Sequence, residues 1–190
     1  MALKNKKGVS TIVATVLIIL ITIVVAGLLA QVIIPYVRNN LQRSSECIPY
    51  QKYFQFEDNI QNKNYNCFKK ASGGSLNVFE SSIKVIGNEK ADPGNINGFN
   101  IVFTDVNLGT SELFSAIKGP SGNSGVLMLE SPQSSIIIPS LTGDVLTYQY
   151  NSKAGYDSSK TYTADVYPVL KSGRICDKSD TIKLVNPCPA

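Results

Sequence analysis

The chain has 190 residues, 18 basic and 14 acidic side chains, no histidine, and a formal net charge of +4. Three lysines lie within the first eight residues, so the rest of the chain carries a charge of only +1. This distribution offers no basic surface of the kind that binds nucleic acid, and we expect no nucleic-acid partner. The lack of histidine removes the commonest general base and metal ligand.

The motifs of common enzyme classes are also missing from the sequence. There is no G-x-S-x-G, no P-loop, and no G-x-G-x-x-G that opens a helix. The few carboxylates are scattered, and the sequence contains no C-x-x-C pair for zinc. We therefore predict that the protein is not an enzyme, with no catalytic residue, cofactor or metal. A surface hydrolase would need a convergent set of polar side chains that the sequence does not offer.

The first predicted element is a helix in the uncharged segment Gly8–Val37, which is 30 residues long. About 20 apolar residues span a bilayer, so the length and composition predict a membrane helix. Basic residues precede the segment and Arg38 follows it, which favours a cytoplasmic N-terminus and an external C-terminus. The helical pattern continues past the membrane boundary, but Pro35 interrupts it, so we expect a bend near Ile34 and an end near residue 46.

An ordinary cleaved signal peptide does not fit this segment. Its apolar core would be about 7–15 residues long and would end at a small-x-small site. The best such site here, Val25-Ala26-Gly27, lies deep within apolar sequence. An uncleaved single-pass anchor remains open.

Small side chains recur along one side of the predicted helix. With 100° per residue, they fall within an arc of about 100°. Such residues let helix backbones approach closely in an apolar medium, so they form a candidate packing face. The alternative is chance, because small residues are common in any spanning helix. The residues concerned are Thr11, Thr15, Thr22, Ala26 and Ala30.

The composition changes after the helix. Residues 47–75 are rich in Asn, Gln, Lys and aromatic side chains without a clear period, and they contain Cys47 and Cys67. We predict an irregular connection here, with one short strand at Tyr53–Phe56.

Residues 76–190 are predicted to form an antiparallel, immunoglobulin-like β-sandwich head. Short apolar stretches alternate with turn signals such as Asp92-Pro93-Gly94 and Lys171-Ser172-Gly173, which is the pattern of a sandwich. The predicted fold class is therefore α+β. The expected strands include Leu76–Phe79, Ile83–Ile86, a strand around Ile101, Leu113–Lys118, Val126–Leu129, Ser135–Ile138, Val145–Tyr150, Tyr162–Val169 and a last strand within Ile175–Val185.

The alternation in the last two strands predicts which side chains enter the core. Threonine and aspartate suit solvent, so the apolar residues between them should point inward. We expect Tyr162, Ala164, Val166, Ile182 and Leu184 to face inward and Lys183 to face outward.

All four cysteines follow the apolar segment, on the predicted external side. An even number of cysteines in an exported chain favours two disulfides over four reduced buried thiols. Four cysteines allow three pairings, and we predict the local one, Cys47–Cys67 with Cys176–Cys188, because both loops are short. The rival pairing joins Cys47 or Cys67 to Cys176.

The start of the chain resembles the class III signal peptide of type IV pilins and archaellins. Lys6-Lys7-Gly8 is followed by Val9-Ser10-Thr11, and "KKGVSTIVATVLIILITIVVAGLLA" is similar above all to archaeal type IV pilins. The resemblance implies a leader, residues 1–8, cut between Gly8 and Val9 by a prepilin peptidase at the cytoplasmic face. The helix of residues 9–46 would then begin the mature subunit.

In that family the retained helix anchors the subunit in the membrane and later packs with other copies, or with related pilins, in a filament core. The resemblance therefore implies a structural subunit of an extracellular filament for adhesion or surface contact. Bacterial pilins carry glutamate at the fifth mature position, where this chain has Val13, which fits an archaeal subunit. The alternative function is a single-pass surface protein whose immunoglobulin-like head binds a ligand or partner.

Overall fold

The computed structural model describes residues 7–60, 62–120, 125–129 and 135–188, and within the N-terminal helix the side chains of 13–38, 41 and 45–47. The chain divides into two compact units, Met1–Glu46 and Cys47–Ala190, called here the stalk and the head. Residues 1–6 of the predicted leader lie outside the described residues.

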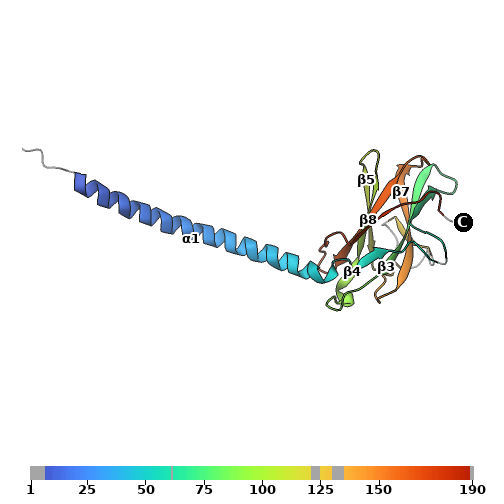
Figure 1. Ribbon diagram of the computed structural model, residues 1–190, viewed down its shortest axis with the longest axis horizontal. Helices are drawn as coiled ribbons and strands as arrows, with labels where there is room; N and C mark the ends of the chain where they lie inside the picture. The colour runs from blue at the N-terminus through green and yellow to red at the C-terminus, as the bar shows by residue number, and fades with distance from the viewer. Residues whose placement is uncertain (1–6, 61, 121–124, 130–134, 189–190) are drawn as a thin grey trace, which may run out of the picture. The chain divides into compact units, whose positions relative to one another are not determined.

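The stalk is one long helix, α1 (Lys7–Cys47), of 41 residues, drawn as a single coiled ribbon in Figure 1. At 1.5 Å per residue it is about 60 Å long. It continues through Pro35, which removes only one of its backbone donors. A helix satisfies its backbone hydrogen bonds within the segment, which is what an apolar surrounding requires. The predicted apolar helix is confirmed, and it ends within two residues of the expected position.

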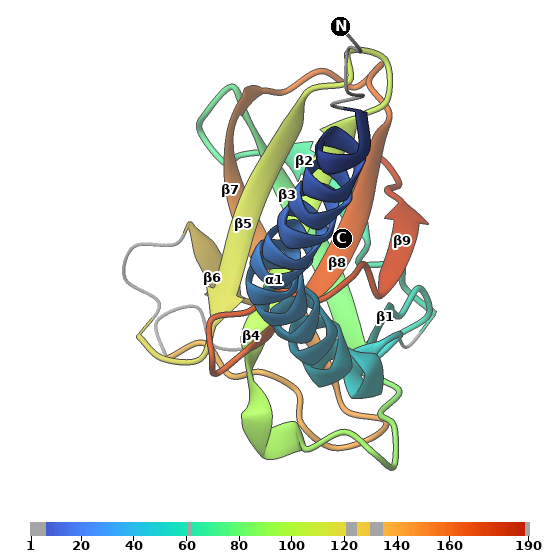
Figure 2. The same cartoon turned by 90° about the vertical axis from the view of Figure 1, so that its left-hand side faces the viewer.

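The head consists of two antiparallel sheets (Figures 1 and 2). The five-stranded sheet has the order β1-β3-β7-β6, with β2 also paired to β3, and the four-stranded sheet has the order β5-β4-β8-β9. The first sheet contains β1 (Phe54–Phe56), β2 (Cys67–Lys70), β3 (Leu76–Val85), β6 (Val126–Met128) and β7 (Val145–Gly155). The second contains β4 (Ile96–Asp105), β5 (Ser111–Ile117), β8 (Tyr162–Leu170) and β9 (Asp180–Lys183). Two 3-10 turns, Ile48–Tyr50 and Pro93–Asn95, lie before β1 and β4.

Aromatic rings from both sheets form the core of the head. The ring of Phe79 on β3 stacks on that of Phe103 on β4, with centroids 4.3 Å apart and planes 11° apart. Phe103 also meets Tyr150 of β7 edge-on at 5.1 Å. Because these contacts cross from one sheet to the other, the head is a two-layer sandwich, and the predicted α+β class is confirmed.

The predicted facing of the last two strands is confirmed. The three expected residues of β8, Tyr162, Ala164 and Val166, are at most 4% exposed. Leu184 is buried, Ile182 packs against the core, and Lys183 is exposed.

The short strand predicted at Tyr53–Phe56 is confirmed as β1, but the rest of residues 47–75 is not the irregular connection that we predicted. Residues 47–75 belong to the head and supply β1 and β2 to the five-stranded sheet. Phe54 and Phe56 are buried on either side of the exposed Gln55, which is the alternation of a half-buried strand. Phe68 is also buried. These phenylalanines bind the segment to the core despite its polar composition.

The predicted strand boundaries need three corrections. Leu76–Phe79 and Ile83–Ile86 are parts of one strand, β3, because the polar residues between them have partners within the head: Ser81 donates to the hydroxyl of Tyr150 at 3.1 Å. Ser135–Ile138 forms only an isolated bridge, from Ile136 to Gly119. In Ile175–Val185 the strand is limited to β9, and Ile175 makes a single bridge to Val169.

One side of the sandwich is closed by the C-terminal segment. After β9 this segment leaves the four-stranded sheet and pairs with the start of β2: the amide of Phe68 donates to the carbonyl of Val185, and the amide of Val185 donates to the carbonyl of Asn66, both at 3.0 Å. Nearby, the amide of Phe56 on β1 donates to the carboxylate of Asp180 at 2.9 Å. The C-terminal segment therefore joins the two sheets.

We predict that Phe103→Ala will lower the free energy of unfolding of the head by about 3–5 kcal/mol, because Phe103 is 1% exposed and contacts rings from both sheets. Val102→Ala is the matched control, since Val102 lies on the same strand with its side chain on the opposite face, half-buried. It should cost about 1 kcal/mol or less. Denaturant titration of the oxidised chain in detergent, followed by tyrosine near-ultraviolet circular dichroism, measures both. Equal losses would contradict the two-layer core.

Candidate functional site

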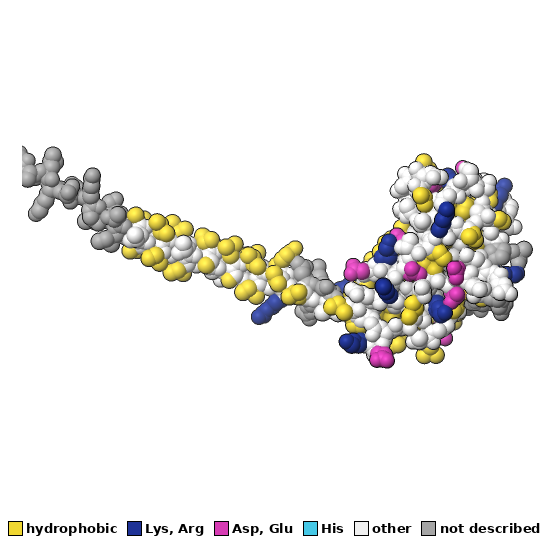
Figure 3. Space-filling view, in the orientation of Figure 1, with side chains coloured by type: hydrophobic (Ala, Val, Ile, Leu, Met, Phe, Trp, Pro, Cys, Tyr) yellow, Lys and Arg dark blue, Asp and Glu magenta, His cyan; other side chains and the backbone are white. Residues whose placement is uncertain are grey.

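Most of the exposed large apolar side chains among the described residues lie on α1. Val13–Arg38, 26 residues and about 39 Å long, is long and apolar enough to cross a membrane. Seventeen large apolar side chains between Val13 and Val37 are 43–69% exposed, and Figure 3 shows them along the helix. At about 1.5–3 kcal/mol for each side chain moved out of water, covering them is worth tens of kcal/mol. The stalk therefore requires an apolar surrounding.

The apolar side chains of α1 cover its whole circumference. Val16–Ile21 are six consecutive apolar residues, and at 100° per residue they reach every side of the helix. A helix lying on a protein surface would instead have one polar face. This stretch suits lipid, or the interior of a bundle of helices, on all sides.

The predicted packing face lies on this one continuous helix, apart from the side chain of Thr11, which is outside the described residues. The hydroxyl of Thr22 donates to the carbonyl of Ile19, one turn earlier, at 2.8 Å. Because that hydroxyl is already bonded within the helix, Thr22 can face an apolar neighbour without leaving a buried donor unpaired. Thr15, Ala26 and Ala30 lie on the same helix, and their role in packing stays a prediction.

The predicted cleavage position lies in the first turn of α1. The helix begins at Lys7, so the bond between Gly8 and Val9 falls among the first residues of the helix. The first four amides of a helix have no partner within it, so opening this turn costs few hydrogen bonds. Cleavage there stays a prediction.

The disulfides differ from the local pairing that we predicted. The structure joins Cys47 to Cys176 and Cys67 to Cys188, with Cα atoms 5.3 and 5.0 Å apart. The first bond is one form of the rival pairing. The reason lies in the closure of the sandwich: the pairing of Val185 with β2 brings Cys188 beside Cys67. The phenylalanine alternation in residues 54–56 was a signal that this segment belongs to the sheet.

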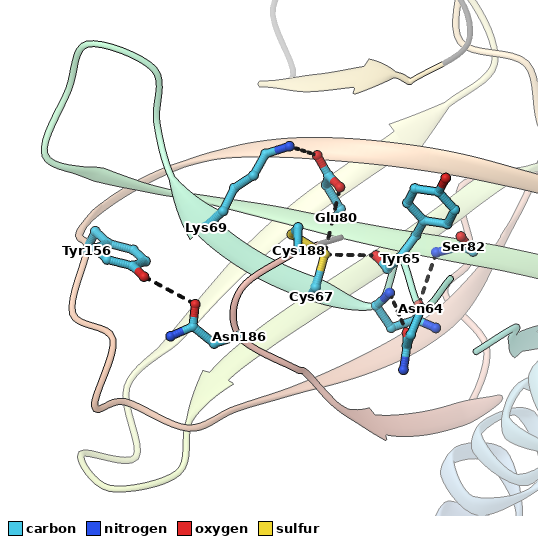
Figure 4. Close-up of a disulfide and its surroundings, with 10 residues drawn as sticks. Asn64, Tyr65, Cys67, Lys69, Glu80, Ser82, Tyr156, Asn186 and Cys188 are labelled. Carbon is cyan, nitrogen blue, oxygen red and sulfur yellow. Dashed lines mark hydrogen bonds and ion pairs between the residues drawn. A yellow bond between two sulfur atoms is a disulfide. The ribbon is translucent and has the colours of Figure 1, made fainter. Parts of the chain in front are cut away.

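A buried carboxylate lies beside the second disulfide (Figure 4). Glu80 of β3 is 1% exposed, forms an ion pair with Lys69, and has its Oε2 3.7 Å from the Sγ of Cys67. Cys67, Glu80 and Cys188 are close enough together to suggest metal ligands. Both sulfurs are consumed by the disulfide, however, and a thiolate is the form of cysteine that binds metal. In the oxidised protein this cluster is part of the sheet rather than a metal centre.

A cavity of about 300 Å³ opens between the sheets where β4 turns into β5. Its floor consists of Phe79, Phe103 and Tyr162, whose side chains are only 1–4% exposed. Two acidic and two lysine side chains form its rim. The rings are therefore largely covered already, and a ligand would have to displace neighbouring side chains to reach them.

The acidic groups of this rim already have partners within the protein. The carboxylate of Glu112 accepts hydrogen bonds from the hydroxyl of Ser152 and from the amide of Lys153, and so links β5 to β7. Asp105 lies 2.9 Å from the Nζ of Lys160. The rim therefore holds the strands together, and we assign it no ligand.

Asp105 also fixes the turn between β4 and β5. Its Oδ1 accepts from the amides of Asn107 and Leu108 at 2.9 and 3.2 Å. The hydrogen bond from Lys160, and then these amides, hold the pKa of the Asp105 carboxyl below its usual range, although partial burial opposes them. Sequence analysis did not single out Asp105, because its partner Lys160 lies far along the chain.

Comparison with known proteins does not assign the chain to a family. No protein-family model matches it, and no curated protein matches it. Among solved structures, it is similar to the archaellum periplasmic stator protein FlaG from Sulfolobus acidocaldarius, at 14% identity and a TM-score of 0.37 over 69% of this chain and 99% of that chain. It is also similar to Astrotactin-2, a vertebrate-specific, perforin-like membrane protein, at 14% identity and a TM-score of 0.34 over 72% of this chain and 22% of that chain. At these TM-scores neither likeness assigns a function.

We predict that peptide mapping of the native protein without reduction will recover the pairs Cys47–Cys176 and Cys67–Cys188. The physical reason is that the structure holds each pair within bonding distance across the joined sheets. The reduced and alkylated digest is the control and should release all four peptides. A linked pair Cys47–Cys67 would contradict the path of the C-terminal segment.

We predict that Asp105→Asn will destabilise the head near neutral pH, and that the loss will shrink as the pH falls. The pKa of Asp105 is lowered in the folded state. The ionised carboxylate therefore stabilises the fold fully above the ordinary aspartate pKa of about 3.9, and this stabilisation is lost as the pH falls through the lower pKa of the folded state. Denaturant midpoints across this range measure the effect. In a Lys160→Met background, the stability loss on Asp105→Asn should depend less on pH. A stability loss on Asp105→Asn that is the same at every pH would contradict a stabilising Lys160–Asp105 ion pair.

Proposed function

We propose that the protein is a structural subunit of an archaeal type IV pilus-like filament that serves adhesion or surface contact. In this proposal a prepilin peptidase removes residues 1–8 after Gly8, and the mature chain starts at Val9. The stalk first anchors the subunit in the cell membrane and then packs with other copies in the core of an extracellular filament. The head lies outside the membrane at both stages.

The observation that carries the proposal is the apolar circumference of α1. No charged residue occurs between Gly8 and Val37, and the exposed apolar side chains reach every side of the helix. Such a helix is stable in lipid and equally in the dry interior of a helix bundle. In both surroundings its backbone groups bond within the helix, and it has no charged side chain that would lack a partner. The same segment can therefore serve as an anchor and as a polymer core.

The basic leader explains why cleavage would have to precede assembly. Lys6 and Lys7 would hold the helix end at the lipid headgroups, since burying a charge in an apolar core costs several kcal/mol without a partner. After cleavage only the amino group of Val9 is left at this end. The mature helix could then leave the bilayer lengthwise.

The predicted packing face suits contact between stalks. Small side chains allow helix axes to approach closely where the surroundings provide no hydrophobic driving force. The internal hydrogen bond of Thr22 removes one polar group from that face. The partners expected in this proposal are copies of the same chain or related pilins.

A single-pass anchored surface protein would share the helix and the head with this proposal. It would differ in keeping residues 1–8 and in leaving α1 in lipid. The N-terminus of the native protein therefore separates the two functions.

We predict that mass spectrometry of the native protein will find Val9 as its first residue, in a fraction sheared from the cells as filaments. Gly8→Leu should leave a full-length, membrane-bound chain and remove at least nine tenths of the sheared protein, because a bulky side chain blocks the peptidase at the scissile bond. Gly8→Ala is the matched control, and it should keep both cleavage and filaments, since alanine is accepted before the cut in the family that the leader resembles. Native filaments built from chains that still begin at Met1 or Ala2 would disprove the proposal.

A further inference from the structure

Together, the two disulfides join the start and the end of the head in one covalent ring. Cys47 is both the last residue of α1 and the first residue of the head, and Cys188 is the last residue of the described chain. The bonds Cys47–Cys176 and Cys67–Cys188 close a covalent ring that runs from residue 47 to 67, across to 188, back to 176, and across to 47. Residues 68–175 form a loop outside this ring.

We propose that this ring is a tension-bearing clasp, which lets the stalk pull on the head without unfolding it. Tension between α1 and the C-terminus has two covalent routes through the head. One runs along residues 47–67 and crosses to Cys188, and the other crosses from Cys47 to Cys176 and runs on to Cys188. Neither route passes along β3, β4, β5, β6, β7 or β8, so none of these strands is part of the covalent path between the two ends of the head.

The shorter route limits how far the head can be stretched. Cys176 and Cys188 are 12 residues apart, so this route can extend to about 40 Å at 3.3–3.6 Å per residue. The longer route runs from Cys47 to Cys67, which are 20 residues apart (67 − 47), and can extend to about 70 Å. Without either bond, the whole segment from Cys47 to Cys188 would carry the load; its ends are 141 residues apart (188 − 47), which is about 490 Å when extended.

The disulfide Cys47–Cys176 also determines which strand of the head bears a force applied through α1. Without it, the pull would reach β1, an edge strand of three residues that pairs with β3 at three positions. A load on the end of so short an edge strand breaks its pairs one after another. The disulfide carries the pull to Cys176, whose amide donates to the carbonyl of Pro168 in β8 at 2.9 Å. Strand β8 lies inside its sheet and pairs with β4 at nine positions.

Hydrogen bonds from the clasp hold β1 in place as well. The amide of Phe54 donates to the hydroxyl of Ser179 at 3.3 Å, and the amide of Phe56 donates to Asp180 at 2.9 Å. Both acceptors belong to the segment between Cys176 and Cys188. The two routes of the ring are therefore bound side by side. This inference does not rest on filament assembly, because an anchored head that is pulled through its C-terminal segment would bear the same tension.

Stretching single molecules of the full chain in detergent, with one handle on the exposed position Leu41 near the end of α1 and the other at the C-terminus, tests the clasp without stretching the stalk. In unreduced wild-type protein the head should add only about 40 Å of extended length, and adding a reductant should raise this to about 490 Å. The pair Cys47→Ser with Cys176→Ser should give about 70 Å, which is about 30 Å longer than wild type. The matched control, Cys67→Ser with Cys188→Ser, should give the wild-type length, because the shorter route is intact.

The stretched length of unreduced wild-type protein tests the clasp even if a variant fails to fold. Release of hundreds of ångströms from unreduced wild-type protein would overturn the proposal. So would a control pair that stretches as far as the reduced chain. Because the stretching experiment concerns only the head, its outcome is independent of whether the stalk assembles into filaments.

Discussion

The head depends on the pairing of its C-terminal segment with β2. Through the two hydrogen bonds between Val185 and residues 66 and 68, a chain that has left the four-stranded sheet joins the five-stranded one. This crossing places Cys188 beside Cys67, closes one side of the sandwich, and holds the edge strand β1 through Asp180. A closed side leaves fewer unpaired strand edges, and so fewer places where another chain could pair with the sheet.

The two units of the chain are stabilised by different means. The head has its own aromatic core and two disulfides that close loops of more than 100 residues, for which the chain-entropy estimate is about 4–5 kcal/mol each. The stalk has no core of its own, since its large apolar side chains are exposed along Val13–Val37. Lipid or other helices would cover these side chains and so stabilise the stalk. Such a stalk can change surroundings without any change in the fold of the head.

Local patterns predicted the parts of the structure that depend on local physics. The uncharged segment predicted α1, and the alternation of Tyr162, Ala164 and Val166 predicted the inward face of β8. The interior of β3 was missed because Glu80, Ser81 and Ser82 look like a turn until their partners on other strands are known. The disulfide pairing was missed for the same reason, since Cys188 is placed by a contact far away in sequence. The cleavage bond and the packing face stay predictions.

The central claim is that the apolar circumference of α1 is covered by other copies of the chain after export. A photoreactive side chain in place of Ile21, which lies within the span Val13–Arg38 and is 60% exposed in the single chain, tests this most directly in living cells. The account predicts that illumination of the surface fraction gives a ladder of covalent dimers and larger multimers of this protein. Adducts with lipid alone, and no multimers, would contradict it and would identify α1 as a permanent membrane anchor.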